Sequence, residues 1–111
     1  MAAQGHTITI EEGSERVRVV ARDGRVLAES HRPLLLSETG YPVRYYLPPE
    51  DVRTELLAVS DTHTRCPFKG TADYWSLADG SAHDIAWSYP DPYDQVSEIK
   101  GYLCFADVEV G

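Results

Sequence analysis

The feature that most constrains the fold is a hairpin signal in residues 16–30, RVRVVARDGRVLAES. Two runs rich in β-branched residues flank Asp23-Gly24, a dipeptide suited to the positive φ angles of a type I′ turn. A turn at these two residues pairs Arg18 with Glu29 as an opposite-charge contact on one face of the hairpin. The other face, which we expect to be the core face, then carries Val17, Val19, Ala21, Val26 and Ala28.

Short runs of the same kind continue along the chain. Alternating or β-rich residues predict further strands in six segments: 6–10, 32–38, 43–48, 71–77, 82–90 and 102–110. Segment 48–58 favours a single helical turn, although its second half fits a strand equally well. Segment 91–101 begins with Asp and Pro and ends with Gly, as short helices do. We expect one mainly β domain over residues 1–111, with seven or eight short strands, an antiparallel arrangement and one or two short helices.

The charge balance argues against two classes of partner. The chain has 18 acidic and 10 basic residues and a formal net charge of −8. Phosphate backbones and anionic membrane surfaces are met by clustered Lys and Arg, so we expect neither nucleic acid nor a membrane as a partner.

The longest apolar run, Leu34–Leu36, is too short to span a bilayer, and the first residues lack a secretory signal. We therefore expect a cytoplasmic protein in which Cys66 and Cys104 are free thiols.

The stretch DTHTRCPFKGT, residues 61–71, raises three kinds of site. A zinc site needs close ligand pairs such as C-x-x-C, which the chain lacks, so we expect no metal and place His63 in a surface loop. A phosphate-binding loop needs a glycine-rich run before its lysine, which Lys69 lacks, and we expect no cofactor. Cys66 as a nucleophile stays open, because Arg65 and Lys69 can favour the thiolate, and the alternative is a buried, inert cysteine.

Basic residues gather around the same stretch. Arg44, Arg53, Arg65 and Lys69 hold four of the ten basic charges within 26 residues. They form either an anion-binding patch in an otherwise acidic chain or a set of solvated loop charges.

Aromatic residues are the second informative feature. They occupy three segments of the chain: Tyr41, Tyr45, Tyr46, Tyr74, Trp75, Trp87, Tyr89 and Tyr93. In a strand, neighbours such as Tyr45 and Tyr46 point to opposite faces, so one ring of each adjacent pair belongs to the core. The other ring faces solvent, a cavity or a partner chain, and we expect a ligand cavity or a subunit interface.

Several motifs follow one another between Val17 and Phe105. They are RVRVV and DGRVLAES, then ETGYPVRYYLPPEDV, SDTHTRCPFKGTADYWS and AWSYPDPYDQVSEIKGYLCF. In this combination the chain resembles the small bacterial family known as domain of unknown function 427, which is also filed as nucleotidyltransferase-like.

The resemblance implies a fold more than a function. It implies a β-tent, in which two antiparallel sheets lean on one another, as in zinc-binding chaperone-like and methionine sulfoxide reductase domains. Those relatives hold zinc with two C-x-x-C pairs, which are absent here, so zinc is not carried over. Polymerase-like transferases use Gly-Ser followed by Asp-x-Asp, whereas Gly80-Ser81 is followed only by Asp84, Asp91 and Asp94.

Three hypotheses about function remain. The first is a small polar or anionic ligand bound in an aromatic cavity by Tyr41, Arg44, Tyr46, Lys69, Tyr74 and Trp87, with the CPFKG turn at its rim. The second is an enzyme of the group-transfer type that uses Cys66 or Lys69. The third is an interaction module that forms a homodimer through its aromatic residues.

Overall fold

The structure is a computed structural model that describes residues 6–111. Within these residues, ten strands form two antiparallel sheets. The larger sheet contains, in spatial order, β1 (Ile8–Glu12), β4 (Leu34–Glu38), β5 (Arg44–Leu47), β9 (Leu103–Phe105), β8 (Ala86–Ser88), β7 (Gly70–Leu77) and β6 (Leu57–Cys66). The smaller sheet contains β10 (Glu109–Val110), β2 (Val17–Val20) and β3 (Val26–Ser30). Three short 3-10 segments connect them: η2 (Pro49–Asp51), η3 (Thr54–Leu56) and η4 (Asp94–Ile99).

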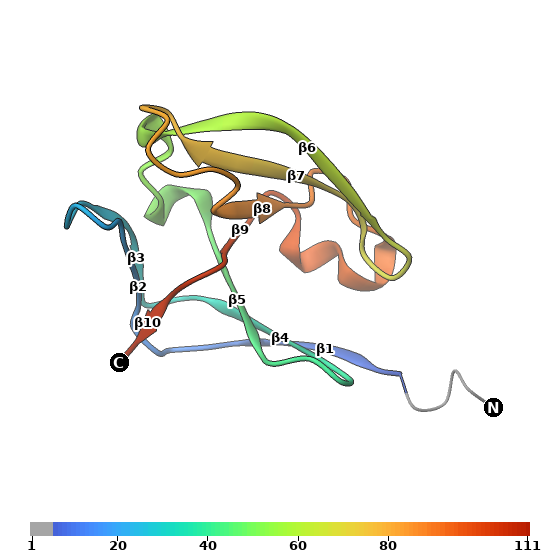
Figure 1. Cartoon of the computed structure of the whole chain (residues 1–111). Coiled ribbons are helices and arrows are strands. Elements are labelled where there is room, and N and C mark those ends of the chain that lie inside the picture. The colour runs from blue at the N-terminus through green and yellow to red at the C-terminus, as the bar shows by residue number, and fades with distance from the viewer. Residues whose placement is uncertain (1–5) are drawn as a thin grey trace.

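The seven-stranded sheet bends into two wings. Figure 1 shows β6, β7 and β8 above and β1, β4 and β5 below, with η4 between the wings. The smaller sheet stands at one end of the bend, where the C-terminus also lies. This mainly β pair of antiparallel sheets confirms the expected tent-like fold. Among residues 6–111, none of the helical segments has the length and apolar character needed to cross a membrane.

Each face of the large sheet carries its own core. Leu103 and Phe105 pack with β2 and β3 of the smaller sheet, whereas Cys104 between them packs on the opposite face with η4. Leu47 and Tyr46 divide in the same way. Alternate residues of a strand point to opposite faces, so a strand buried on both sides is apolar at every position. The two cores explain why YYL and LCF are continuous apolar runs.

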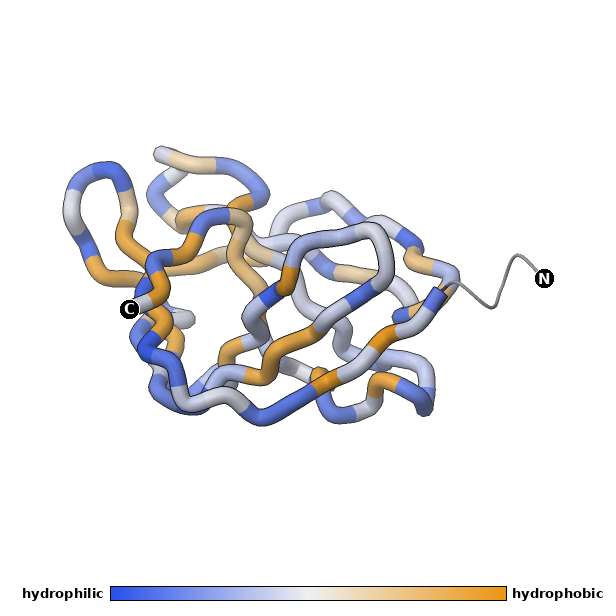
Figure 2. Tube along the Cα trace, turned by 90° about the horizontal axis from the view of Figure 1, so that it is seen from below, coloured by the Kyte–Doolittle hydropathy of each residue, from blue (hydrophilic) through white to orange (hydrophobic). Residues whose placement is uncertain are grey.

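The predicted β2–β3 hairpin exists, but its turn differs from the predicted type. Arg18 pairs with Glu29, as expected. Gly24 has a φ of +92°, whereas Asp23 does not have the positive φ that a type I′ turn requires. A bulge near Val19 moves Leu27 into the core in place of Val26, because an extra residue in one strand reverses the alternation. Figure 2 shows this hairpin at the left, with apolar arms and a hydrophilic tip.

Other segments also differ from the sequence prediction. Ten strands are present where seven or eight were expected, residues 57–66 form the single strand β6, and the strand predicted over residues 82–90 is confined to β8. Residues 102–110 form two strands instead of one, because β9 pairs in the large sheet while β10 pairs with β2 in the small sheet. The segment predicted as a short helix is a 3-10 segment, η4, interrupted at Val96 with φ −128° and ψ 28°. Val96 and Ile99 are fully buried against the large sheet, so tertiary packing and not helix propensity determines this segment.

Candidate functional site

A cavity of about 520 Å³ lies between the two wings of the large sheet. Its lining comes from β4 to β8 and from the turns that join them. Six of its lining residues are the ligand-binding candidates of the sequence analysis: Tyr41, Arg44, Tyr46, Lys69, Tyr74 and Trp87. Cys66, the candidate nucleophile, lines the same cavity. The fold therefore gathers at one place residues that come from three separate segments of the sequence.

A row of side chains across four neighbouring strands builds one wall. Tyr46 on β5 pairs with Cys104 on β9, and Cys104 pairs with Trp87 on β8. Trp87 in turn pairs with Tyr74 on β7, and directly paired residues point to the same face. Cys104 is fully buried on β9, the strand between them, so the rings of Tyr46 and Trp87 are separated by one strand and only a small side chain lies between them. The Trp87 indole N–H donates across this distance to the Tyr46 hydroxyl at 3.4 Å.

The guanidinium of Arg44 lies over the ring of Trp87. Its Cζ is 5.2 Å from the centroid of the Trp87 ring, which is a cation–π contact. Arg44 is half-buried, and it forms no ion pair with any residue in the described range 6–111. A planar guanidinium that lies over an aromatic ring keeps the N–H groups at its edge free to bind a carboxylate or a phosphate.

A buried ion pair joins the two wings beside the cavity. Lys69 Nζ donates to Glu38 Oε1 at 2.7 Å, and the two side chains are only 11% and 9% exposed. The other Glu38 oxygen lies 3.1 Å from His6 Nε2, although the ring is not aligned for a hydrogen bond. His6 also stacks on Phe68, with the ring centroids 3.9 Å apart. The positive charge of Lys69 is therefore already balanced within the protein.

The CPFKG stretch is the tip of the β6–β7 hairpin. Cys66 pairs with Gly70, and the Lys69 backbone N–H donates to the Cys66 carbonyl at 3.3 Å. The Tyr93 N–H donates to the Lys69 carbonyl at 3.0 Å, so the loop after β8 supports the tip. Gly70 has a φ of +116°, and a Cβ at this position would lie 3.3 Å from the Asp91 carbonyl. Glycine is required here, because it tolerates both the positive φ and the close loop.

Burial raises the pKa of two phenols in the cavity and of a thiol behind its wall. Loss of solvation raises the pKa of Tyr46 and that of Tyr89 well above the usual phenol value. Burial also raises the pKa of the Cys104 thiol to about 12. The Tyr74 hydroxyl is held by a hydrogen bond of 3.0 Å with the Thr64 hydroxyl. The hydroxyl groups of Tyr46 and Tyr89 line the cavity and can exchange hydrogen bonds with a ligand while contributing no charge at neutral pH.

Sequence reasoning missed one important residue of this site. Glu38 lies at the end of an apolar strand and contacts a residue 31 positions away, a separation that leaves no local pattern. The predicted patch of four basic residues is also divided. Arg44 and Lys69 line the cavity, whereas Arg53 and Arg65 are exposed and do not belong to its lining.

The position of His63 differs from the one expected from the sequence. His63 lies in strand β6 and not in a loop, and its Nδ1 is 3.0 Å from an oxygen of Asp73. Across residues 6–111, no group of three or more His, Cys, Asp or Glu side chains is arranged to hold a metal ion. Both cysteines are free thiols.

Comparison with known proteins identifies the family of the chain. No curated protein matches the sequence. The family model described as "Domain of unknown function (DUF427)" matches residues 9–111, a range that includes every residue lining the cavity between the wings. The chain therefore belongs to the DUF427 family.

Proposed function

We propose that the protein binds a small anionic molecule with a flat apolar body in the cavity between the wings. The observation that carries this proposal is the state of Arg44. Its guanidinium lies over the Trp87 ring, lines the cavity and is engaged by no carboxylate of residues 6–111. A cation that is oriented and half-buried but unpaired is a receptor for a carboxylate or a phosphate.

Charge favours an anion over a cation in this cavity. Three side chains that are ionised at neutral pH line it: Glu38, Arg44 and Lys69. Glu38 and Lys69 balance each other, so Arg44 leaves the lining with one positive charge in a chain of net charge −8. A local positive charge within an acidic protein attracts anions selectively to that place.

The walls and the volume suit a small aromatic or otherwise flat molecule. Small-molecule sites commonly enclose about 300–1,000 Å³, and this cavity encloses about 520 Å³. Tyr46, Tyr74 and Trp87 supply flat apolar surface with polar groups at the ring edges. The uncharged phenols offer hydrogen bonds without repelling an anion.

The test uses benzoate and phenyl phosphate as probes and benzyl alcohol as their uncharged analogue. Binding is followed through the indole N–H signal of Trp87 in ¹H–¹⁵N correlation spectra. We expect the two anions to shift this signal, because they reach the Arg44–Trp87 stack, and we expect benzyl alcohol to leave it unchanged. Anions that leave the Trp87 signal in place at millimolar concentration would contradict the proposal.

A variant pair assigns the effect to Arg44. Arg44→Met keeps an apolar contact with Trp87 but removes the charge, and we expect it to weaken binding of the anionic probes about tenfold. Arg53→Met removes the same charge from an exposed position outside the cavity and serves as the control. Equal affinity in the two variants would show that Arg44 does not hold the anion.

One observation supports thiol chemistry as a second candidate. Cys66 lines the same cavity as Arg44, so a bound molecule would lie within reach of its sulfur. The rate of alkylation as a function of pH measures the acidity of this thiol directly. A midpoint well below that of a free thiol, about 8.5, would support a nucleophilic role, whereas a midpoint at or above it would remove this candidate.

We also infer a cytoplasmic location for this activity. The two cysteines are unpaired thiols, which suits a compartment that keeps thiols reduced. Fractionation of the native host would test this inference, and recovery in an oxidising compartment would contradict it.

A further inference from the structure

A second cavity, of about 550 Å³, has no part in the function proposed above. It lies between the tip of the β2–β3 hairpin and the segments that follow β7 and β9. Its inner wall is apolar, because Leu27, Leu77 and Phe105 are each at most 5% exposed. Ala82 and Ile85 continue this wall towards the opening. Its volume is again that of a small-molecule site.

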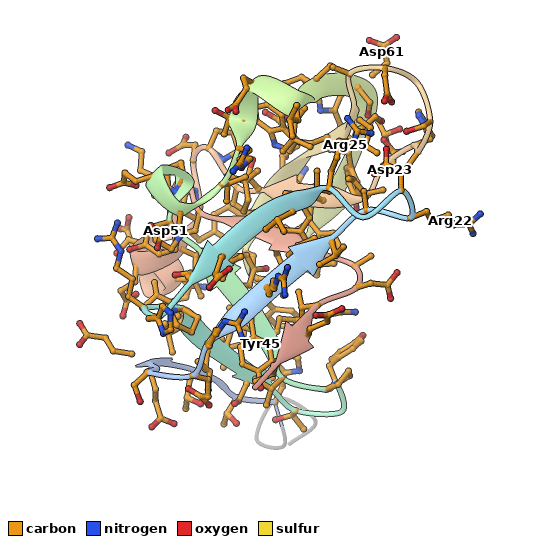
Figure 3. All side chains as sticks on the ribbon, turned by 90° about the vertical axis from the view of Figure 1, so that its left-hand side faces the viewer. Arg22, Asp23, Arg25, Tyr45, Asp51 and Asp61 are labelled. Carbon is orange, nitrogen blue, oxygen red and sulfur yellow. The ribbon has the colours of Figure 1, made fainter. Side chains whose placement is uncertain are left out.

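A charged clasp links the hairpin to the far side of this cavity. Arg25 donates from Nε to Asp23 and from Nη2 to Asp79, both at 2.8 Å. Asp79 lies in the turn after β7, so the Arg25 guanidinium ties the hairpin tip to the other side of the opening. Figure 3 shows Arg25 and Asp23 close together at this end of the molecule. The side chains of Arg25, Asp23 and Asp79 are 35%, 56% and 49% exposed, so the clasp links the two sides of the cavity but adds little stability by itself.

The charge around the opening is negative on balance, because two guanidinium groups (Arg22 and Arg25) stand against three carboxylates (Asp23, Asp79 and Asp107). Asp23 and Asp79 are both engaged by Arg25. Arg22 also lines the cavity and has no ion-pair partner among residues 6–111, but it is exposed, and Figure 3 shows its side chain extending away from the ribbon. Asp107 is exposed as well; it lines the cavity and forms no ion pair with any residue of the described range 6–111. An apolar chamber with an unpaired carboxylate at its edge suits an apolar body that carries one positive charge.

We propose that this second cavity binds an organic amine. The alkyl or aryl part lies against Leu27, Leu77 and Phe105, and the ammonium group pairs with Asp107. The net charge of −8 favours the approach of such a cation. The two cavities then select ligands of opposite charge, an anion beside Arg44 and an amine beside Asp107.

The test compares 2-phenylethylamine with 3-phenylpropionate, two probes that present the same phenyl group with opposite charges. In ¹H–¹⁵N spectra, the backbone signals of Ala82 and Ile85 report on the second cavity, and the indole signal of Trp87 reports on the first. We expect the amine to shift the Ala82 and Ile85 signals and the carboxylate to leave them in place. The proposal is overturned if the amine shifts neither signal, or if both probes shift them equally.

Two variants locate the charge that selects the amine. We expect Asp107→Asn to weaken binding of 2-phenylethylamine about fivefold, which corresponds to about 1 kcal/mol. Asp61→Asn removes an exposed carboxylate of β6 that lines neither cavity, and it should bind the amine as the wild type does. Equal affinity in these two variants would refute the proposal.

A third variant tests the apolar chamber itself. Ala82→Phe places a ring in the cavity, and we expect it to abolish the shift that the amine causes at Ile85. If this variant does not fold, the comparison of Asp107→Asn with Asp61→Asn still decides the proposal. Unchanged affinity in a folded Ala82→Phe protein would place the amine elsewhere and overturn the assignment.

Discussion

The ion pair between Glu38 and Lys69 ties the two wings of the large sheet together, so breaking it should destabilise the fold around the cavity. The perturbation is Glu38→Met or Lys69→Met. Each substitution keeps the length of the side chain and removes one charge, which leaves the partner charge buried. The N–O distance of 2.7 Å and the exposures of 11% and 9% identify a desolvated pair.

The expected loss of stability follows from that burial. Removing one partner of a buried pair costs about 3–5 kcal/mol, because the remaining charge has no counterion. A domain of this size loses roughly 4 °C in Tm for each kcal/mol, so the lower end of this range is a fall of about 12 °C. Lys69→Met should cost less than Glu38→Met, because His6 Nε2 already lies 3.1 Å from Glu38 and can replace the lost donor.

The assay is a double-mutant cycle measured by urea and thermal unfolding. We expect the double variant Glu38→Met/Lys69→Met to be within about 1 kcal/mol of the wild type, since an apolar pair often replaces a buried ion pair without loss. The control is Arg16→Met, which breaks an ion pair of 3.0 Å between Arg16 and Glu29. The side chains of these two residues are 44% and 41% exposed. This exposed pair should be worth less than about 1 kcal/mol.

Additive effects would refute this reasoning. If each single variant lost less than about 1 kcal/mol, and the double variant lost the sum, the pair would behave as an exposed one. The wings would then be held together by the apolar core alone.

Three further outcomes follow from the structure. Gly70→Ala should destabilise by about 2–3 kcal/mol in urea unfolding, and by more than Gly24→Ala, because both positions have positive φ but only Gly70 faces a backbone carbonyl within 3.3 Å; equal losses would contradict this. Because burial raises the pKa of Cys104 to about 12, iodoacetamide at pH 8 should add one group to the native protein, at Cys66, and two after unfolding; two rapid additions to the native protein would show that Cys104 is accessible. Hydroxyl groups of β6 donate to the Asp84 carboxylate and lower its pKa, so its charge stabilises the fold above the unfolded-state pKa of about 3.9, and this contribution is lost as the pH falls further. Asp84→Asn, which tolerates the positive φ of 51°, should therefore be less stable than the wild type at pH 7 and equal to it near pH 2. An equal difference at both pH values would exclude this charge effect.

Local pattern was sufficient for most of the strands and of the hairpin, but not for the ten-residue strand β6 or for the division of residues 102–110 into β9 and β10. Alternation in 17–20 and 26–30 depends only on neighbouring residues, and it correctly pairs Arg18 with Glu29. The turn type was wrong because an Asp-Gly pair is compatible with more than one loop length. The bulge that buries Leu27 depends on contacts with strands elsewhere in the chain, which no local pattern contains.

The cavity shows the same division more clearly. The clustering of Tyr and Trp selected the rings that line it, because paired aromatics in a strand cannot all lie in one core. Their geometry required the strand order, in which β9 from the end of the chain inserts between β5 and β8. Only this order places Cys104 between Tyr46 and Trp87 and brings Arg44 over the indole ring.

The sequence by itself determined that this protein is a small, acidic, mainly β domain with more aromatic side chains in its strands than one core face can take up. Those properties are sums over residues or patterns between near neighbours, so they can be read without knowing the fold. The tertiary structure alone decided that Lys69 is balanced by Glu38, that Arg44 is left unpaired, and that Asp107 faces a second cavity. These are facts about charge at short range, and the Coulomb energy between two side chains depends on distances and burial that only the folded chain defines.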